Sequence, residues 1–213
     1  MLLGALQSLL DEVYDLDLPY DVADFLTTDA GFAQAVDRGG RSLEEKLLIA
    51  EADGEANVSL YLEQRLLDRL ESNDPMAKLD GANLEDFWTA FEGVSHFTYY
   101  VWNARLEKPV TLLEMELQAE VDKFVATALL LLRQGGRQPP NLHKWLFELP
   151  KFDERLEGAE LDRYRSANRY AGKYCRRLAP ALAQSPADVA VMRELRRFYR
   201  LSQTPKIEHI ESG

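Results

Sequence analysis

The chain has 213 residues, of which 46% are hydrophobic and 29% are charged, so it is long enough to bury the core of one domain. Its formal net charge of −11 repels nucleic acid and anionic membranes, which leaves such a partner only a local basic patch. A single cysteine excludes an internal disulfide framework and a cysteine zinc cage. The longest wholly apolar run, residues 128–132, is too short to cross a bilayer, and we expect a cytoplasmic protein.

The N-terminal part is expected to combine helices with a small sheet. Apolar residues recur at helical spacing over residues 2–13, which predicts a helix that ends near Asp15. Two short apolar runs, 47–52 and 55–62, flank the dipeptide Asp53-Gly54. This pattern favours a β-hairpin, because a type I′ turn needs positive φ at both central residues. Two further elements complete this part: a short strand at 22–26 that could pair with the hairpin, and a helix at 63–71.

Helical periodicity continues from Asn83 almost to the C-terminus. Asn83 is placed to cap the first of these helices, Pro109 suits an opening turn, and Asp188 adds an acidic residue to the first turn of the last. The expected helices are 84–107, 109–134, 142–149, 159–184 and 186–202.

These elements define the expected fold class, which is α+β and predominantly α. We expect a bundle of five or six helices with a small N-terminal antiparallel β-hairpin unit. Residues 1–203 should form a single domain, with a mixed part at 1–80 and a helical part at 83–203. Residues 204–213 are expected to be a C-terminal tail.

One face of the helix 84–107 gathers polar residues that could form a site. Glu92 and His96 lie one turn apart, which lets the carboxylate meet the imidazole and select its tautomer. Tyr99 and Asn103 fall on the same face and are candidate binding residues. The same pattern also fits a helix between two neighbours, with His96 hydrogen-bonded to a buried group and without a further role.

A carboxylate in the next helix strengthens the case for a site. Glu114 interrupts an apolar stripe, and a buried carboxylate needs a partner such as His96 or an arginine. If the protein is an enzyme, we expect His96 to act as general base, with Glu92 or Glu114 orienting it. Arg165 or Arg169 would then hold an anionic small substrate.

The spacing of possible ligands argues against a metal centre. Glu116 and Glu120 could add oxygen ligands to Glu92 and His96. Di-metal helical bundles, however, place Glu and His three residues apart in two separate helices, and the single helical Glu and His pair here is four apart. We therefore expect no metal and no cofactor. Motifs of phosphate loops, nucleophile elbows and zinc proteases are also missing, and Cys175 falls on an apolar stripe as a buried, inert thiol.

Positive charge is concentrated near the C-terminus. Residues 161–207 carry 11 Lys and Arg against 3 Asp and Glu, within a chain that is acidic overall. Arginine binds phosphate and carboxylate through two parallel hydrogen bonds, so these residues could form a binding surface. Pairing with the acidic N-terminal part, or solvation, would explain the same pattern. Two helix faces carry these cations: Arg165, Arg169, Lys173 and Arg176 on the helix 159–184, and Arg193, Arg196, Arg197 and Arg200 on the helix 186–202.

These observations favour a non-enzymatic binding or adaptor protein of a larger assembly. It would hold an anionic partner, either an acidic protein surface or nucleic acid, on the arginine-rich faces of its last two helices. The alternative is an enzyme with an acid–base pocket at Glu92, His96 and Glu114. A protein partner is expected and a membrane is not, while nucleic acid and a homo-oligomer both stay open.

Overall fold

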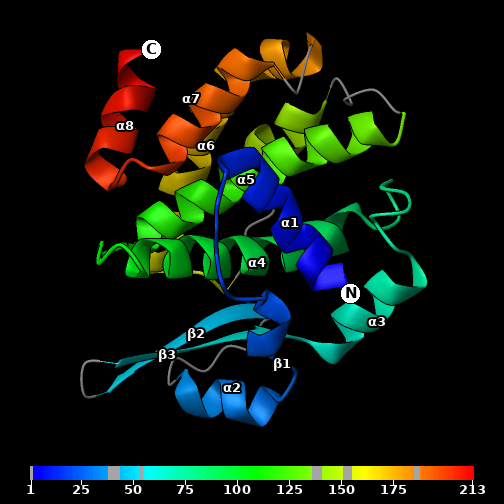
Figure 1. Cartoon of the computed structure of the whole chain (residues 1–213), viewed down its shortest axis with the longest axis vertical. Helices are drawn as coiled ribbons and strands as arrows, with labels where there is room; N and C mark the ends of the chain where they lie inside the picture. Colours follow the sequence, from blue (N-terminus) through cyan, green and yellow to red (C-terminus); the bar gives the residue numbers. More distant parts are fainter. Residues whose placement is uncertain (1, 38–43, 53–54, 136–140, 151–154, 185–187) are drawn as a thin grey trace.

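The structure is a computed structural model that describes residues 2–37, 44–52, 55–135, 141–150, 155–184 and 188–213. It is predominantly helical, with a small sheet at one end, as the sequence predicts (Figure 1). No helix in the described ranges is long and apolar enough to cross a membrane. The α-helices are α1 (Leu2–Tyr14), α2 (Ala30–Val36), α3 (Gln64–Ser72), α4 (Leu84–Ala104), α5 (Leu112–Arg133), α6 (Gly158–Gln184), α7 (Val189–Tyr199) and α8 (Gln203–Ser212).

The sheet has three described strands in the order β1-β3-β2. Strands β2 (Glu45–Ala52) and β3 (Glu55–Leu62) pair antiparallel, as predicted for a hairpin, and the expected turn at Asp53-Gly54 lies outside the described residues. Strand β1 (Leu26–Thr27) pairs parallel with β3, so the unit is mixed rather than purely antiparallel. A 3-10 turn, η1 (Val22–Phe25), occupies most of the segment predicted to be a strand.

Helices cover both faces of this sheet. Helix α2 packs below the strands and α4 lies above them (Figure 1). Because side chains alternate along a strand, Leu48 and Tyr61 face α2 in a small cluster, whereas Leu60 joins the main core. The sequence analysis did not predict α2, whose first turn is capped by Asp29 accepting a hydrogen bond from the Phe32 amide at 3.0 Å.

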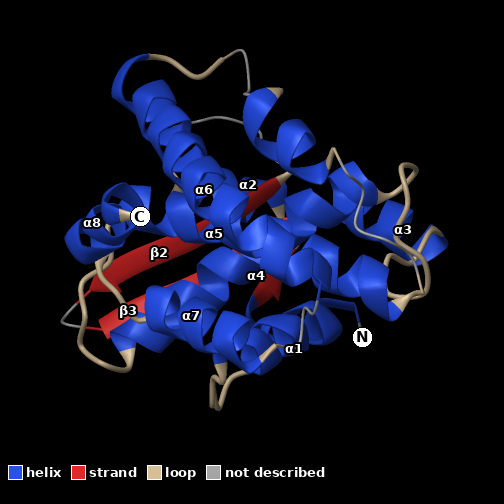
Figure 2. Ribbon diagram, turned by 90° about the horizontal axis from the view of Figure 1, so that it is seen from above, coloured by secondary structure: helices blue, strands red, loops and turns tan. Residues whose placement is uncertain are grey.

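Helix α5 lies at the centre of the bundle, with α1, α4 and α6 packed around it (Figure 2). It runs antiparallel to α4, since residues later in α4 contact residues earlier in α5. Trp88 bonds to Thr127 at 2.9 Å, and Ser95 bonds to Asp122 at 2.6 Å. Every residue from 121 to 130 is buried, so α5 is enclosed on all sides rather than along one apolar stripe.

The helices begin and end close to the predicted positions, but the residues that cap them differ from those predicted. Asn83 precedes α4 without capping it, because its side-chain amide instead donates to the carbonyl of Lys78 at 2.8 Å. Thr111, not Pro109, forms the N-terminal border of α5 and accepts from the amide of residue 114 at 3.1 Å. Asp188 is itself the N-cap of α7 and accepts from two amides of the first turn. A π-helical turn, η2 (Lys144–Glu148), forms most of the predicted helix 142–149.

The predicted C-terminal tail is wrong, because residues 203–212 form helix α8 and pack on the bundle. Lys206 and Ile210 of this helix are fully buried. The Lys206 ammonium lies 4.4 Å from the centre of the Tyr99 ring and donates a hydrogen bond to Gln118. Burial lowers the pKa of Lys206 to about 7, although neighbouring carboxylates oppose this shift. The last helix is therefore part of the core.

Candidate functional site

A cleft of about 940 Å³ opens beside the start of β2 and between α4, α5, η2 and α6. One wall is charged and includes Glu45, Glu92 and Lys123. Apolar side chains from the segment around η2 form another wall, in which Trp145 is 43% exposed and Leu149 is 61% exposed. A volume of this size and a mixture of apolar and ionised side chains are typical of small-molecule sites.

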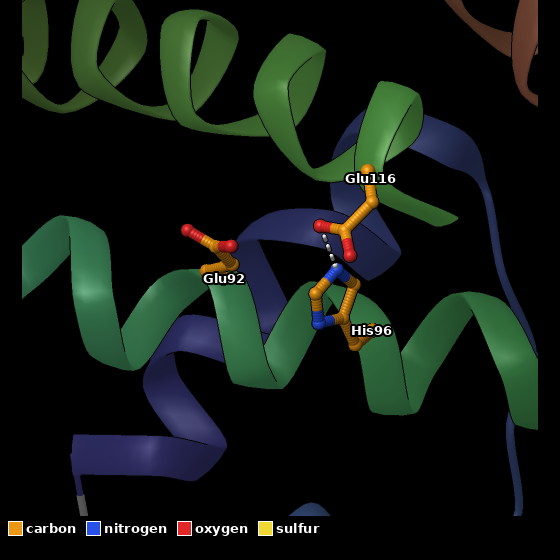
Figure 3. A group of neighbouring side chains, drawn as sticks. All are labelled: Glu92, His96 and Glu116. Carbon is orange, nitrogen blue, oxygen red and sulfur yellow. Dashed lines mark ion pairs between the residues drawn. The ribbon is translucent and has the colours of Figure 1, made fainter. Parts of the chain in front are cut away.

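Behind the charged wall, the antiparallel helices α4 and α5 bring acidic residues onto one histidine. Glu92 and His96 lie one turn apart on α4, as predicted, and Glu116 faces them from α5 (Figure 3). The His96 Nε2 atom is 3.5 Å from the Glu116 Oε2 atom. Both side chains are less than a tenth exposed. The sequence analysis considered these three residues together as possible ligands but expected no metal there, and the structure does bring them together.

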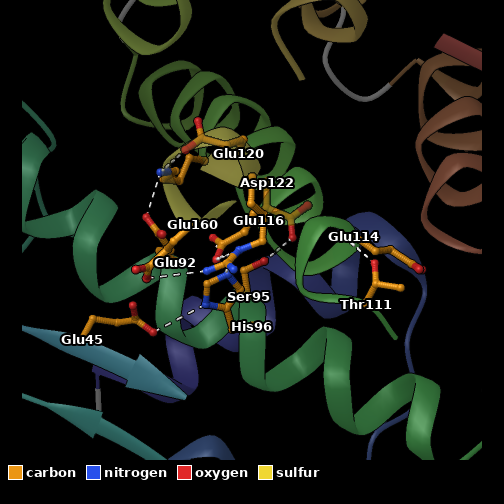
Figure 4. A network of polar contacts seen from close by, with 12 residues as sticks. Glu45, Glu92, Ser95, His96, Thr111, Glu114, Glu116, Glu120, Asp122 and Glu160 are labelled. Carbon is orange, nitrogen blue, oxygen red and sulfur yellow. Dashed lines mark hydrogen bonds and ion pairs between the residues drawn. The ribbon is translucent and has the colours of Figure 1, made fainter. Parts of the chain in front are cut away.

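Strand β2 adds a carboxylate on the other side of the imidazole. Glu45 Oε1 lies 3.6 Å from His96 Nδ1, so the ring is held between two carboxylates (Figure 4). This approach depends on Gly93, because a Cβ atom at that position would lie 2.7 Å from Glu45 Cγ and 2.8 Å from a methyl group of Leu60. The close approach of β2 to α4 therefore requires a glycine at this position.

Two cations complete this group of side chains. Lys123 Nζ lies 2.8 Å from both Glu92 and Glu120, and Arg163 Nε lies 3.7 Å from Glu116. We name the assembly the charged cluster. Its members are Glu45, Glu92, His96, Glu116, Glu120, Lys123 and Arg163.

The carboxylates of the charged cluster favour the protonated forms of His96 and Lys123. Burial alone would lower the pKa of the His96 imidazole, but the carboxylates of Glu116 and Glu45 outweigh burial and hold this pKa well above its usual value. Burial would likewise lower the pKa of Lys123, yet its two carboxylate neighbours raise it. Burial raises the pKa of Glu45 itself. The carboxylates therefore stabilise positive charge on His96 and Lys123.

The charged cluster is not fully hydrogen-bonded. Six buried side-chain atoms in the described part of the chain lack a hydrogen-bond partner, and three of them belong to the charged cluster. These three are Glu45 Oε1, His96 Nε2 and Arg163 Nε. Buried polar atoms in native proteins are nearly always satisfied, so a concentration of exceptions calls for a ligand or a functional explanation.

The predicted pocket that joined His96 to Glu114 does not form. Glu114 is buried, as expected, but accepts hydrogen bonds from the Tyr99 hydroxyl and from the amide of Gln203 at 3.0 Å, not from His96 or an arginine. The Asn103 amide donates to the carbonyl of Tyr99 at 2.9 Å, within its own helix. Glu114 thus ties α5 to α4 and to α8, and Figure 4 shows it away from the charged cluster.

The arginine face predicted on α6 is partly paired. Lys173 lies 2.8 Å from Glu211, and Arg176 bonds to Glu148 at 3.2 Å. Arg169 is exposed and stacks over the ring of Tyr170, while Arg165 is exposed and has no ion pair with another described residue. Neither Arg165 nor Arg169 is among the described residues that line the cleft.

Two of the four arginines predicted to form a face on α7 bond to α1, and the other two are exposed. Arg196 donates to the carbonyls of Glu12 and Val13, and Arg200 donates to the carbonyl of Tyr14 at 3.1 Å. These contacts neutralise the carboxyl end of α1, where the helix leaves unpaired carbonyls and partial negative charge. The other two side chains, Arg193 and Arg197, are exposed and form no ion pair within the described ranges.

Several cluster residues were missed or given no role by the sequence analysis. Glu45 begins a strand far from α4 in sequence, and only the sheet topology brings it to His96. Lys123 sits three residues after Glu120 and one turn of α5 beyond it, a spacing that could have indicated the pair. Cys175, by contrast, is buried with a raised pKa, as predicted for an inert thiol.

No family model, curated protein or solved structure matches this chain.

Gly93→Ala should destabilise the protein by about 1–3 kcal/mol, because the added methyl group collides with Glu45 and Leu60. Urea unfolding monitored by circular dichroism measures this change. Gly4→Ala in α1 is the matched control, since its Cβ would meet only Asp21 at 3.7 Å, and it should be neutral or stabilising by about 1 kcal/mol. Equal stability of the two variants would contradict the close contact between β2 and α4.

Proposed function

We propose that the protein is an enzyme that acts on a small molecule bound in the cleft, with the charged cluster as its polar machinery. The observation that carries this proposal is the juxtaposition of the cleft with ionised side chains that are held in place yet incompletely hydrogen-bonded. Rigid, buried charges next to an open cavity are the arrangement by which enzymes polarise a substrate or exchange protons with it.

The groups that would touch a substrate are carboxylates rather than the imidazole. Glu45, Glu92 and Glu120 line the cleft, whereas His96 lies behind them with only 7% of its surface exposed. His96 is then a positioning residue, because its two ring nitrogens face Glu45 and Glu116. The general-base role expected for His96 passes in this proposal to the carboxylates that reach the cleft.

The walls of the cleft also restrict the substrate. Six of its described lining residues are acidic and two are basic, which disfavours an anionic molecule unless a cation accompanies it. The apolar wall with Trp145 and Leu149 fits an aromatic or aliphatic group. A neutral or cationic molecule with an apolar part satisfies both walls.

Metabolite profiling tests this function. The wild-type protein is incubated with a small-molecule cell extract, and changes in metabolite levels are followed by mass spectrometry. Glu45→Gln should abolish any conversion at nearly unchanged shape, and Trp145→Ala should weaken it through lost binding. Glu71→Gln, an exposed change on α3 away from the cleft, is the control and should behave like the wild type. A conversion that proceeds at the wild-type rate in Glu45→Gln would refute the proposal.

A second candidate function is the binding of an anionic partner on the arginines of α6 and α7. It is favoured by four side chains that stay exposed after internal pairing is taken into account. Two lie one turn apart on each helix, a spacing that suits bidentate contacts to phosphate or carboxylate groups. They are Arg165 and Arg169 on α6, and Arg193 and Arg197 on α7.

Fluorescence anisotropy with a labelled single-stranded oligonucleotide and with a labelled polyglutamate peptide tests this second function. Binding should weaken steeply with salt and fall at least about tenfold in the double variant Arg193→Glu, Arg197→Glu. Arg176→Glu is the control, because Arg176 is already paired with Glu148. The same affinity in both variants, or no binding at low salt, would remove the arginine surface from consideration.

A further inference from the structure

We propose that Glu92, His96 and Glu116 form a binding site for one divalent transition-metal ion of the series from Mn²⁺ to Zn²⁺. The inference rests on the proposed function only in that the ion would serve the same cleft. Its physical basis is separate, and it departs from the expectation of a metal-free protein.

The geometry of the three side chains suits a metal. One ligand atom from each of Glu92, His96 and Glu116 lies within 4.8 Å of the others (Figure 3). Bonds of about 2.0–2.2 Å to nitrogen and oxygen place neighbouring ligand atoms roughly 3–3.6 Å apart, which is the range of the 3.5 Å contact between His96 and Glu116. Small side-chain rotations would therefore complete the site without a change of backbone.

An independent observation points to a ligand at the imidazole. The His96 side chain is only 8% exposed, and its Nε2 atom has no hydrogen-bond partner in the described structure. That nitrogen faces Glu116, while the other ring nitrogen faces Glu45 at 3.6 Å (Figure 4). Metal-bound histidines are commonly held this way, with a carboxylate on one nitrogen and the metal on the other.

Charge favours an ion at the same point. Four carboxylates of the charged cluster face Lys123, Arg163 and the His96 imidazole, whose pKa they raise, so a divalent ion that takes the place of the His96 proton would offset the remaining negative charge. One imidazole with two carboxylates is a donor set for transition metals, whereas Ca²⁺ and Mg²⁺ favour sites made of oxygen alone.

The position of the site connects it to the cleft. Glu92 lines the cleft, and three protein ligands leave at least one coordination position for water or a substrate oxygen. Lys123, 2.8 Å from Glu92, competes with the ion for this carboxylate. An ion held here would also allow an oxygen anion of a substrate to enter a cleft whose walls are otherwise acidic.

Isothermal titration of the untagged protein with ZnCl₂, MnCl₂ and MgCl₂ tests the site. We expect one Zn²⁺ or Mn²⁺ per chain, with Mg²⁺ bound at least about tenfold more weakly. Glu92→Gln and Glu116→Gln should each lower Zn²⁺ affinity at least about tenfold. Glu114→Gln, a buried carboxylate two residues away in the Tyr99 contact, should leave this affinity unchanged.

Nitrogen NMR of the wild-type protein labelled in its histidines avoids dependence on the folding of variants. The chain has three histidines, and Zn²⁺ should shift the Nε2 resonance of His96 while leaving those of His143 and His209 in place. No binding of Zn²⁺ or Mn²⁺, or Zn²⁺ binding without a His96 shift, overturns the metal site. A Glu45-dependent conversion that survives a chelator would keep the enzyme and reject the ion, whereas metal binding without any conversion would do the reverse.

Discussion

Helix α5 must bury ionised and polar side chains on two sides at once, and the rest of the structure is arranged around that requirement. The helix is enclosed by α1, α4 and α6, yet its buried residues include Glu114, Glu116, Asp122 and Lys123. Each such group loses several kcal/mol of hydration unless a partner replaces water. These partners come from α1, α4, α6 and α8, so elements far apart in sequence are tied to one central segment.

The two sides of α5 meet this requirement to different degrees. Asp122 accepts hydrogen bonds from Tyr14 at 2.5 Å, Ser95 at 2.6 Å and Gln118 at 2.7 Å, so its carboxylate is fully engaged. On the opposite side, the charged cluster keeps three buried atoms without a partner and lies next to the cleft. A complete network stabilises a core, whereas an incomplete one next to a cavity costs stability and is retained where a ligand uses it.

Periodicity and turn residues were sufficient to predict most long helices and the paired strands β2 and β3, because these elements satisfy their own backbone groups locally. Helix α8 was missed because its burial depends on Lys206 contacting aromatic rings, a tertiary effect without a sequence period. The same limit applies to the site. The position of Glu114 on an apolar stripe indicates that it needs a partner. The sequence does not indicate that this partner is Tyr99. For the arginines of α7, the sequence leaves a binding face and internal pairing both open, because the helix end that Arg196 and Arg200 neutralise is adjacent only in the fold.

The central claim is that one side of α5 is optimised for stability and the other for a ligand. Its most direct measurement compares the free energies of unfolding of two variants that each remove one buried carboxylate charge at neutral pH. Asp122→Asn should lower stability by about 1–3 kcal/mol, because three donors lose their charged acceptor. Glu45→Gln should leave stability unchanged or raise it, because it reduces the excess negative charge. A loss in Glu45→Gln as large as that in Asp122→Asn would show that the charged cluster is an ordinary part of the core.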